Sequence, residues 1–234
     1  MIIKPIRTRV FKEGENLFSF VAQYFKKIPE KSIVVVTSKI VALSEKRVAI
    51  VKNKKTKEKL IRKESEFALL TKYVWLTIKD GMVMASAGID ESNANGKLIL
   101  LPKDSFKTAY FLRKKLRQKY KIKKLGVLIA DSRTMPLCSG VIGVALGYAG
   151  FRGIKNYVGT PDIFGRKFKF SHTDVADSLA TGAVLVMGEG NEQQPLSVIE
   201  KAPIEFCDKI NKNELHINIK DDMYRPLFSK LKKL

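Results

Sequence analysis

Three short acidic segments, each beside an apolar stretch, carry the residue types best suited to chemistry. Residues 87–93 place Asp90 between two strand-like runs, Asp131 follows the apolar residues 125–130, and Glu189 lies inside a glycine-rich segment. Carboxylate and amide oxygens are the ligands that Mg²⁺ and Mn²⁺ prefer. An isolated acid of this kind is more often an ordinary turn residue. Three of them at the ends of apolar elements predict a converging metal–phosphate site.

Apolar periodicity predicts the elements that position these segments. Helices are expected over residues 15–27, 55–70, 105–119 and 173–186. Strands are expected over residues 2–6, 33–36, 48–51 and 125–130, with Asp80-Gly81 joining residues 74–78 and 82–86 as a hairpin. Residues 151–165 are glycine-spaced and are expected to be irregular. Because strands and helices intermix without strict alternation, the sequence predicts an α+β fold of mixed sheets, hairpins and a few packed helices.

Composition bounds the class of protein. The 234 residues carry a formal net charge of +21, from 44 Lys and Arg against 23 Asp and Glu. Only ten of the basic residues are Arg, and the lysines are widely spread, so dedicated nucleic-acid recognition is not favoured, although it is not excluded. Two Cys and two His are too few for a disulfide framework or a zinc site. With no apolar run long enough for a bilayer, we expect a cytoplasmic protein.

The order of several motifs is similar to that of one known family. AGIDESN (residues 87–93) is followed by LLPKD, IADS, GYAG, a run with Gly159, Asp162 and Gly165-Arg166, then VADSLA and MGEG. From about residue 3 to residue 202 the chain resembles the coenzyme F420 gamma-glutamyl ligase family. The resemblance implies that family's fold, an intertwined homodimer, and GTP-dependent addition of L-glutamate to an acidic acceptor through an acyl phosphate. ATP in place of GTP stays open.

The resemblance also implies roles for individual residues. Two divalent cations, Mg²⁺ or Mn²⁺, are expected, the first held by Asp90 and Asp131 and the second near Glu189, with the Ser132 hydroxyl reaching a metal or a phosphate. No residue is assigned as a catalytic acid, base or nucleophile. The residues expected to contact the nucleotide are Arg9, Val10, Phe11, Lys12, Ser38, Lys39, Asn93, Met187, Gly188, Gly190 and Asn191.

The chain departs from the family pattern where acceptor-binding cations are expected. Met135, Cys138 and Ser139 stand in the segment that follows Asp131-Ser132, which leaves a displaced Arg133. Each lost charged hydrogen bond is worth about 1.5–3 kcal/mol, so an acidic or phosphorylated acceptor should bind less well. The acceptor is then either coenzyme F420-0 or another acid, such as a folate-like one. Cys138 is expected to be a small apolar filler rather than a nucleophile.

Two functional hypotheses therefore remain. The first is a gamma-glutamyl ligase whose partners are GTP, L-glutamate and an acidic small molecule. The second is a non-catalytic nucleotide- or nucleic-acid-binding protein on the same fold. No linker or repeat divides the chain, so residues 1–203 are expected to form the ligase-like domain, with two intertwined subdomains as an option. Residues 204–234 are expected to be a peripheral Lys-rich tail.

Overall fold

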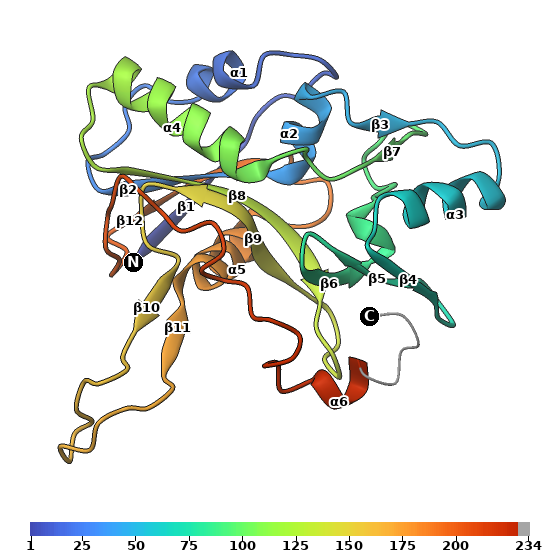
Figure 1. The fold of residues 1–234 in the computed structure, drawn as a ribbon. Helices are drawn as coiled ribbons and strands as arrows, with labels where there is room; N and C mark the ends of the chain where they lie inside the picture. The colour runs from blue at the N-terminus through green and yellow to red at the C-terminus, as the bar shows by residue number, and fades with distance from the viewer. Residues whose placement is uncertain (229–234) are drawn as a thin grey trace.

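A mixed five-stranded sheet forms the centre of the computed structural model, which describes residues 1–228 (Figure 1). The strands lie in the order β1-β12-β2-β8-β9, and β2 and β8 are its parallel pair. Their bounds are β1 Ile2–Ile6, β2 Ser32–Thr37, β8 Leu125–Thr134, β9 Val141–Ala149 and β12 Leu196–Glu200. Almost every residue of β2 is buried, as expected for a strand covered on both faces.

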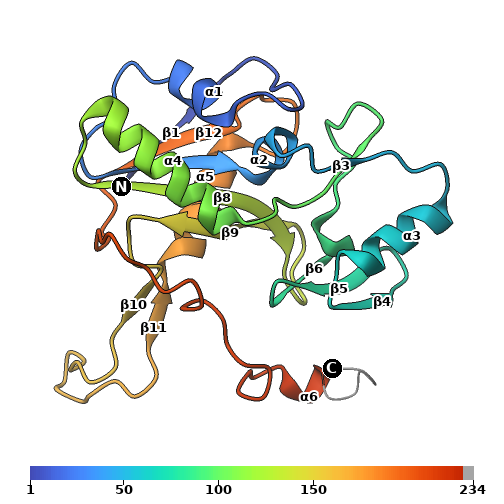
Figure 2. The ribbon, with the colours of Figure 1, turned by 45° about the horizontal axis from the view of Figure 1, so that its top comes forward.

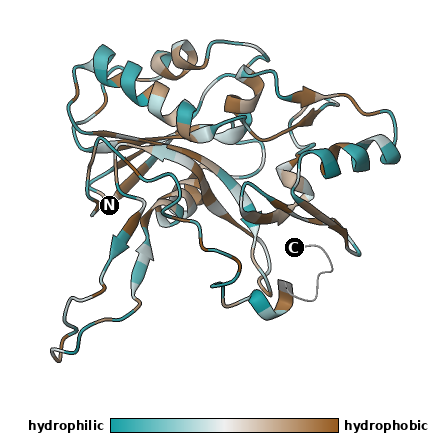
Figure 3. Ribbon diagram, in the orientation of Figure 1, coloured by the Kyte–Doolittle hydropathy of each residue, from teal (hydrophilic) through white to brown (hydrophobic). Residues whose placement is uncertain are grey.

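Helices cover both faces of this sheet. One face carries α1, α2 and α4, and the other carries α5 (Figures 1 and 2). Because side chains alternate along a strand, Val34 and Val36 enter the first core whereas Ile33 and Val35 enter the second. The central sheet is correspondingly hydrophobic in Figure 3. The helix bounds are α1 Leu17–Gln23, α2 Ser38–Ser44, α4 Ser105–Tyr120 and α5 Val175–Met187.

A smaller substructure is inserted between α2 and α4 and lies beside the central sheet (Figure 2). It contains α3 and an antiparallel three-stranded sheet in the order β4-β5-β6, together with the short pair β3 and β7. The turn between β5 and β6 is Asp80-Gly81, and both residues have positive φ, as a two-residue hairpin of type I′ requires. The bounds are β3 Val48–Ala49, α3 Lys54–Lys63, β4 Phe67–Leu70, β5 Trp75–Lys79, β6 Met82–Ala85, η1 Ser86–Gly88 and β7 Leu98–Ile99.

A hairpin arm projects from the body next to α5 (Figure 1). Its strands are β10 (Ile154–Asn156) and β11 (His172–Asp174), and the segment between them carries exposed apolar side chains. These side chains are Val158, Ile163, Phe164, Phe168 and Phe170. Concentrated exposed apolar residues on a protein of this size usually mark an interaction site.

The segment after β12 returns along the body and ends, within the described residues, in α6 (Arg225–Phe228). Asp208 pairs with Arg113 of α4 at 2.6 Å, and the Tyr148 hydroxyl of β9 donates to Glu214 at 2.6 Å. The predicted boundary at residues 203 and 204 stays a prediction, and residues 229–234 of the predicted tail lie outside the described part. None of the helices within residues 1–228 is long and apolar enough to cross a membrane.

The structure confirms the α+β prediction but corrects several elements. Residues 154–156, within the segment expected to be irregular, form β10; the helix expected over residues 15–27 spans only Leu17–Gln23; and α2 and β12 were not predicted. The helix expected over residues 55–70 ends at Lys63, and Phe67–Leu70 forms β4, because four apolar residues in a row favour pairing with β5. The strand expected over residues 125–130 continues to Thr134, because β9, which the sequence did not predict, pairs with it along that length. Asp131 therefore lies inside a strand rather than after one.

Candidate functional site

The backbone of Asp90 is fixed by an unusual turn. All three residues of η1 have positive φ, including the fully buried Ala87 at 57°. The Ala87 N–H donates to the buried Thr77 hydroxyl at 2.8 Å, which holds the turn in place. Asp90 then exchanges two backbone hydrogen bonds with Ile99, of 2.9 and 2.8 Å. Left-handed backbone is costly for residues other than glycine, so these contacts must hold the turn that presents the Asp90 carboxylate.

The carboxylate of Asp90 meets a lysine from the other side of the site. Lys39 Nζ lies 2.6 Å from Asp90 Oδ2, and it also donates to the carbonyl and hydroxyl oxygens of Ser92, each at 2.9 Å. Ser92 donates its N–H and its hydroxyl to the same carboxylate, at 2.7 and 2.8 Å. Burial alone would raise the pKa of Asp90, but the hydrogen bonds from Lys39 and Ser92 outweigh it and lower the pKa.

Asp131 is the most strongly perturbed acid of the site. Its carboxylate accepts from the Ser38 hydroxyl at 2.7 Å and from the N–H of Ser132 at 2.7 Å. The parallel pairing of β2 and β8 brings Ser38, the first residue of α2, beside it. Burial raises the pKa of Asp131 to about 6, and the neighbouring charge of Asp90 adds to the rise, while Ser38 and Ser132 oppose it. Asp90 and Asp131 therefore share one electrostatic environment.

Glu189 approaches the same place from the end of α5. The Ser132 hydroxyl donates to its carboxylate at 3.2 Å. Gly188 ends the helix with φ 81° and ψ 165°, a conformation open essentially to glycine alone. An added Cβ at Gly188 would lie 2.4 Å from the Glu192 carboxyl carbon, and Glu192 in turn accepts from the Gly190 N–H at 2.8 Å. The glycines thus let the loop fold tightly around Glu192 and expose Glu189.

Asn93 ties two of the acidic segments together. Its side-chain amide donates to the Gly190 carbonyl at 3.0 Å, across 97 positions of sequence. Its own backbone is left-handed, with φ 53°, which Asn tolerates better than most residues. The segments of Asp90, Asp131 and Glu189 therefore meet in one place, as the sequence predicted. Of the remaining loop positions, Met187 is buried, whereas Asn191 is exposed.

The N-terminal segment borders this place through a second set of contacts. Arg9 forms an ion pair with Glu15 and stacks over the Phe20 ring, with its guanidinium carbon 5.0 Å from the ring centroid. Phe11 is buried against Phe20, with ring centroids 4.8 Å apart, so residue 11 can offer a ligand only its backbone. Val10 and Lys12 are exposed. The Thr8 N–H donates to the Gln193 carbonyl at 2.8 Å, which joins this segment to the loop after α5.

The segment expected to bind the acceptor forms the exposed tip of the β8–β9 hairpin. Met135, Ser139 and Cys138 are not buried there, so the prediction of Cys138 as a buried filler is wrong. The filler prediction failed because β9 turns residues 135–140 into a projecting loop. The half-buried Arg133 reaches away toward Asp177 at the start of α5, 3.5 Å distant, and its Nε atom is buried without a hydrogen-bond partner.

The donor set fits a hard divalent cation, provided that a ligand completes it. The oxygens of Asp90, Asp131, Ser132 and Glu189 are all hard ligands, and a cation beside Asp131 would offset the burial that raises the pKa of that acid. Among residues 1–228, no three His, Cys, Asp or Glu side chains approach closely enough to hold a metal by themselves. A metal here would be bound by carboxylate pairs together with phosphate oxygens or water, as is usual for Mg²⁺.

Two residues of the site were missed from the sequence. Ser92 bridges Lys39 and Asp90, and its place two residues after an Asp is the ordinary signal of an Asx turn. Glu192 organises the glycine-rich loop, but its contacts with Gly188 and Gly190 depend on a backbone path that no spacing rule predicts.

Comparison with known proteins agrees with this architecture. A family model described as F420-0:Gamma-glutamyl ligase matches residues 5–201. Coenzyme F420:L-glutamate ligase of Methanococcus maripaludis strain C7 is 33% identical over 231 residues, covering 91% of this chain and 92% of the relative. The proteins of the same name from Methanocaldococcus jannaschii and Archaeoglobus fulgidus are 32% and 29% identical, and they cover 84% and 81% of this chain and 86% and 83% of the respective relatives.

Proposed function

Because the chain belongs to the F420-0:gamma-glutamyl ligase family and is an amide-bond-forming ligase, we propose that it joins L-glutamate to an acidic acceptor at the expense of GTP. The acceptor is coenzyme F420-0 or, given the uncharged hairpin tip, a folate-like or other acid. The dependence on GTP and on a divalent metal is part of the proposal. Because the chain belongs to a ligase family, we favour a ligase over a nucleic-acid-binding protein despite the net charge of +21.

The observation that carries the proposal is the hydrogen-bonded chain from Ser38 through Asp131 and Ser132 to Glu189. It joins residues from three separate elements around one polar surface, with Lys39 and Asp90 beside it. Such an arrangement suits phosphoryl transfer, in which catalysis depends mainly on positioning and on charge compensation. A purely structural role would not require so many exposed or half-exposed polar groups in one place.

In the proposed reaction, an acceptor carboxylate oxygen attacks the γ-phosphorus of GTP, and the bond to GDP breaks. The glutamate amine then attacks the acyl carbon, phosphate leaves, and the amine loses a proton. Lys39 would support the first step by exchanging Asp90 for a phosphate oxygen, because an ammonium group binds either anion. A phosphate oxygen would replace Glu192 as the acceptor of the Gly190 N–H, and the absence of a side chain at Gly190 would let it approach the backbone closely.

Two divalent cations are proposed to complete the site. Asp90 and Asp131 would hold one, and Glu189 with Ser132 would hold the other. Such ions neutralise phosphate charge and orient the reacting groups. The remaining nucleotide contacts are assigned to Ser38, Asn93, the loop of residues 187–191 and the segment of residues 9–12.

A homodimer is also proposed. The arm formed by β10 and β11 carries Phe164 and Phe170 in highly exposed positions, at 89% and 87% of their full accessible surface. The arm extends from the body in both views of the ribbon (Figures 1 and 2), as expected of a segment that embraces a second copy of the chain. Burial of these rings by a partner would remove the largest apolar exposure on the arm.

The direct experiment measures glutamate-dependent release of phosphate from GTP in the presence of Mn²⁺, against a panel of acidic acceptors. The expected result is phosphate release that requires both glutamate and one acceptor, with a product one glutamate heavier by mass spectrometry. Phosphate release that does not depend on glutamate, whichever acceptor is present, would contradict the proposal. ATP in place of GTP tests the nucleotide preference in the same assay.

A further inference from the structure

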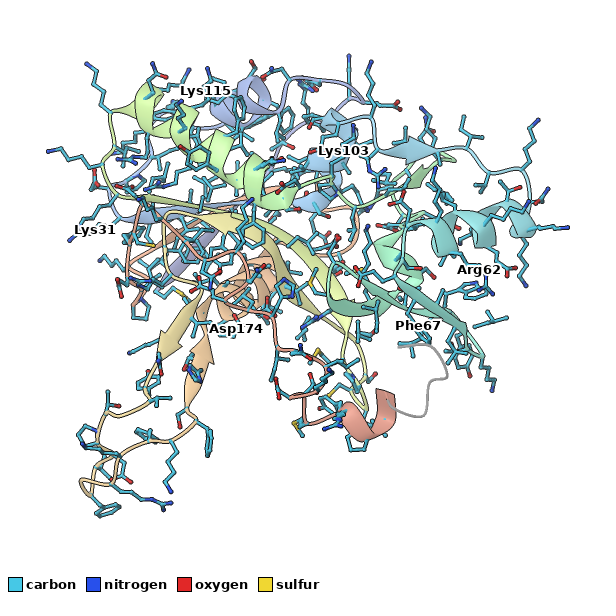
Figure 4. All side chains as sticks on the ribbon, in the orientation of Figure 1. Lys31, Arg62, Phe67, Lys103, Lys115 and Asp174 are labelled. Atoms are coloured by element: carbon cyan, nitrogen blue, oxygen red, sulfur yellow. The ribbon has the colours of Figure 1, made fainter. Side chains whose placement is uncertain are left out.

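A basic groove runs between α4 and the segment that follows β12. The groove consists of two adjoining cavities of about 480 and 450 Å³. Tyr110 and Asp208 line both of them. The cationic side chains that line the two cavities are Lys107, Arg113, Lys114, Arg117 and Lys212. Arg113 and Arg117 pair with Asp208, whereas Lys107 and Lys212 pair with Asp104. Basic side chains also project from much of the remaining surface (Figure 4). What distinguishes the groove is therefore the way in which its cations are held.

Two arginines of the groove are held in fixed orientations by the backbone. Arg113 donates its Nε–H to the Leu125 carbonyl at 2.7 Å, and its side chain is only 6% exposed. Arg117 donates its Nε–H to the Ile122 carbonyl at 3.3 Å. With Nε engaged, the outer nitrogens of both guanidinium groups are turned to a common acceptor. This arrangement is a preformed clamp for one carboxylate or phosphate.

Asp208 occupies the clamp from within the chain. Its Oδ1 atom lies 2.6 Å from Arg113 Nη2 and 3.1 Å from Arg117 Nη1, and the pKa of Asp208 is lowered chiefly by the hydrogen bond from Arg113. The Asp208 side chain is nevertheless 73% exposed. Because the Asp208 carboxylate faces solvent, another anion can reach the two guanidinium groups and compete with Asp208 for them.

The second cavity adds a hydrophobic, aromatic surface beside the clamp. Phe106 lines it and packs on the fully buried Tyr148, with ring centroids 5.3 Å apart, and Ile210 also lines it. Tyr110, at the junction of the two cavities, is 58% exposed. Aromatic walls of this kind accept flat rings, and the size of each cavity falls in the usual range for small-molecule sites.

We propose that this groove binds an aromatic anion, with the anionic group on Arg113 and Arg117 in place of Asp208 and the ring against Phe106 and Tyr110. The site is separate from the acidic site. Arg113 is bound to Leu125, the first residue of β8, and Asp131 lies six residues farther along the strand, about 20 Å away at roughly 3.3 Å per residue. A nucleotide-like molecule and a free aromatic phosphate share the required chemistry.

The test uses 1-naphthyl phosphate as the probe, titrated into the full chain by calorimetry at low salt with EDTA present. Arg117→Gln should weaken binding about fivefold or more, the usual effect of losing one partly exposed charged contact. Asp208→Asn should strengthen binding several-fold, because it removes the internal competitor. Lys115→Gln is the matched control: it removes one charge from the same helix, Lys115 is not among the residues lining the groove, and binding should not change.

Arg117→Gln and Asp208→Asn should change the affinity in opposite directions, and this difference distinguishes a ligand site from a structural ion pair. If Asp208 serves only to attach the C-terminal segment, Asp208→Asn lowers the melting temperature and does not strengthen binding, which overturns the proposal. Equal affinity for all four proteins, or no binding by the parent chain and Asp208→Asn, also overturns it. Inorganic phosphate should bind more weakly than naphthyl phosphate, and equal affinity would contradict the role of the aromatic surface. Nucleoside monophosphates in the same titration distinguish the two sources of ligand.

Discussion

Lys39 Nζ lies 2.6 Å from Asp90 Oδ2, so an ammonium group provides the positive charge beside an acid proposed to bind a metal. A divalent cation at Asp90 has to compete with Lys39. We therefore expect Lys39→Met to bind Mn²⁺ in the absence of nucleotide about fivefold more tightly, the scale of a partly exposed ion pair. The same variant should bind GTP with Mn²⁺ more weakly, because a phosphate loses its ammonium partner. Calorimetry of both titrations measures the two effects.

The control for this substitution is Lys57→Met, which removes the lysine paired with the adjacent Glu91. The change in net charge is the same, but Glu91 is outside the proposed metal set. Lys57→Met should leave both affinities close to those of the parent chain. If the two variants behave alike, the effect of Lys39 is one of overall charge and its competition with the metal is refuted.

Asp131→Asn should abolish metal-dependent binding of GTP and leave the fold intact. The substitution keeps the size of the side chain, so no cavity forms. The single Asn oxygen can accept from the Ser132 N–H while its amide donates to the Ser38 hydroxyl, which can rotate to accept, so no donor is stranded. Calorimetry of GTP with and without Mn²⁺ measures the binding, and thermal unfolding checks the fold. An unfolded variant would show that Asp131 is a structural residue, and unchanged Mn²⁺ dependence would show that it does not hold the metal.

The raised pKa of Asp131 predicts a pH dependence of stability. With a pKa of about 6 against an ordinary value of 3.8, the folded protein holds this proton more tightly than the unfolded chain does. The contribution of protonated Asp131 to the free energy of unfolding is fully present below about pH 4 and is lost as the pH rises to about 6. Relative to the parent, Asp131→Asn should thus gain free energy of unfolding across that window, by at most about 3 kcal/mol at about 1.4 kcal/mol per pKa unit. Urea unfolding of both proteins in EDTA at pH 4.5 and pH 7.5 measures the difference, which would be constant if Asp131 titrated normally.

Coenzyme F420-0, with its phosphodiester and carboxylate, should be a poor acceptor. Met135, Cys138 and Ser139 at the hairpin tip offer it no cation, and Arg133 is directed toward Asp177. Turnover with coenzyme F420-0 is to be compared with turnover on other acids, pteroates included, at saturating GTP and glutamate. Efficient glutamylation of coenzyme F420-0 would show that this tip does not anchor the acceptor.

The arm should hold two chains together. Phe164→Asp combined with Phe170→Asp places charges on its exposed rings, and a buried charge without a partner is strongly unfavourable. Sedimentation should show a dimer for the parent and a monomer for the double variant. Val10→Asp is a suitable control, because Val10 is 69% exposed and belongs to a different segment. A parent chain that sediments as a monomer would contradict the proposed homodimer.

Local signals predicted much of the fold and located the three acidic segments that the structure brings together. Apolar spacing predicted α4, which Asp104 caps, and α5, and Asp80-Gly81 predicted its hairpin. The three acidic segments were found because an acid beside an apolar run is visible in sequence. Strand pairing between residues far apart in the sequence could not be predicted. Residues 141–149 look like a glycine-containing loop in the sequence, and they form β9 only because β8 pairs with them. For the same reason the contact of Lys39 with Asp90, across 51 positions, could not be predicted from spacing.

The exposed tip of the β8–β9 hairpin also bears on how such a protein can diverge. Residues 135–140 project from the sheet and Leu137 is fully exposed, so their side chains contribute little to the core. Surface substitutions of this kind usually change stability by less than about 0.5 kcal/mol. The acids, by contrast, lie on a central strand, a turn of positive φ and a glycine loop, where the backbone is held by many more contacts. On the proposed assignment of acceptor to the tip and nucleotide to the acids, mutation could alter the choice of acceptor with little cost to the fold, while the nucleotide site would be constrained by folding.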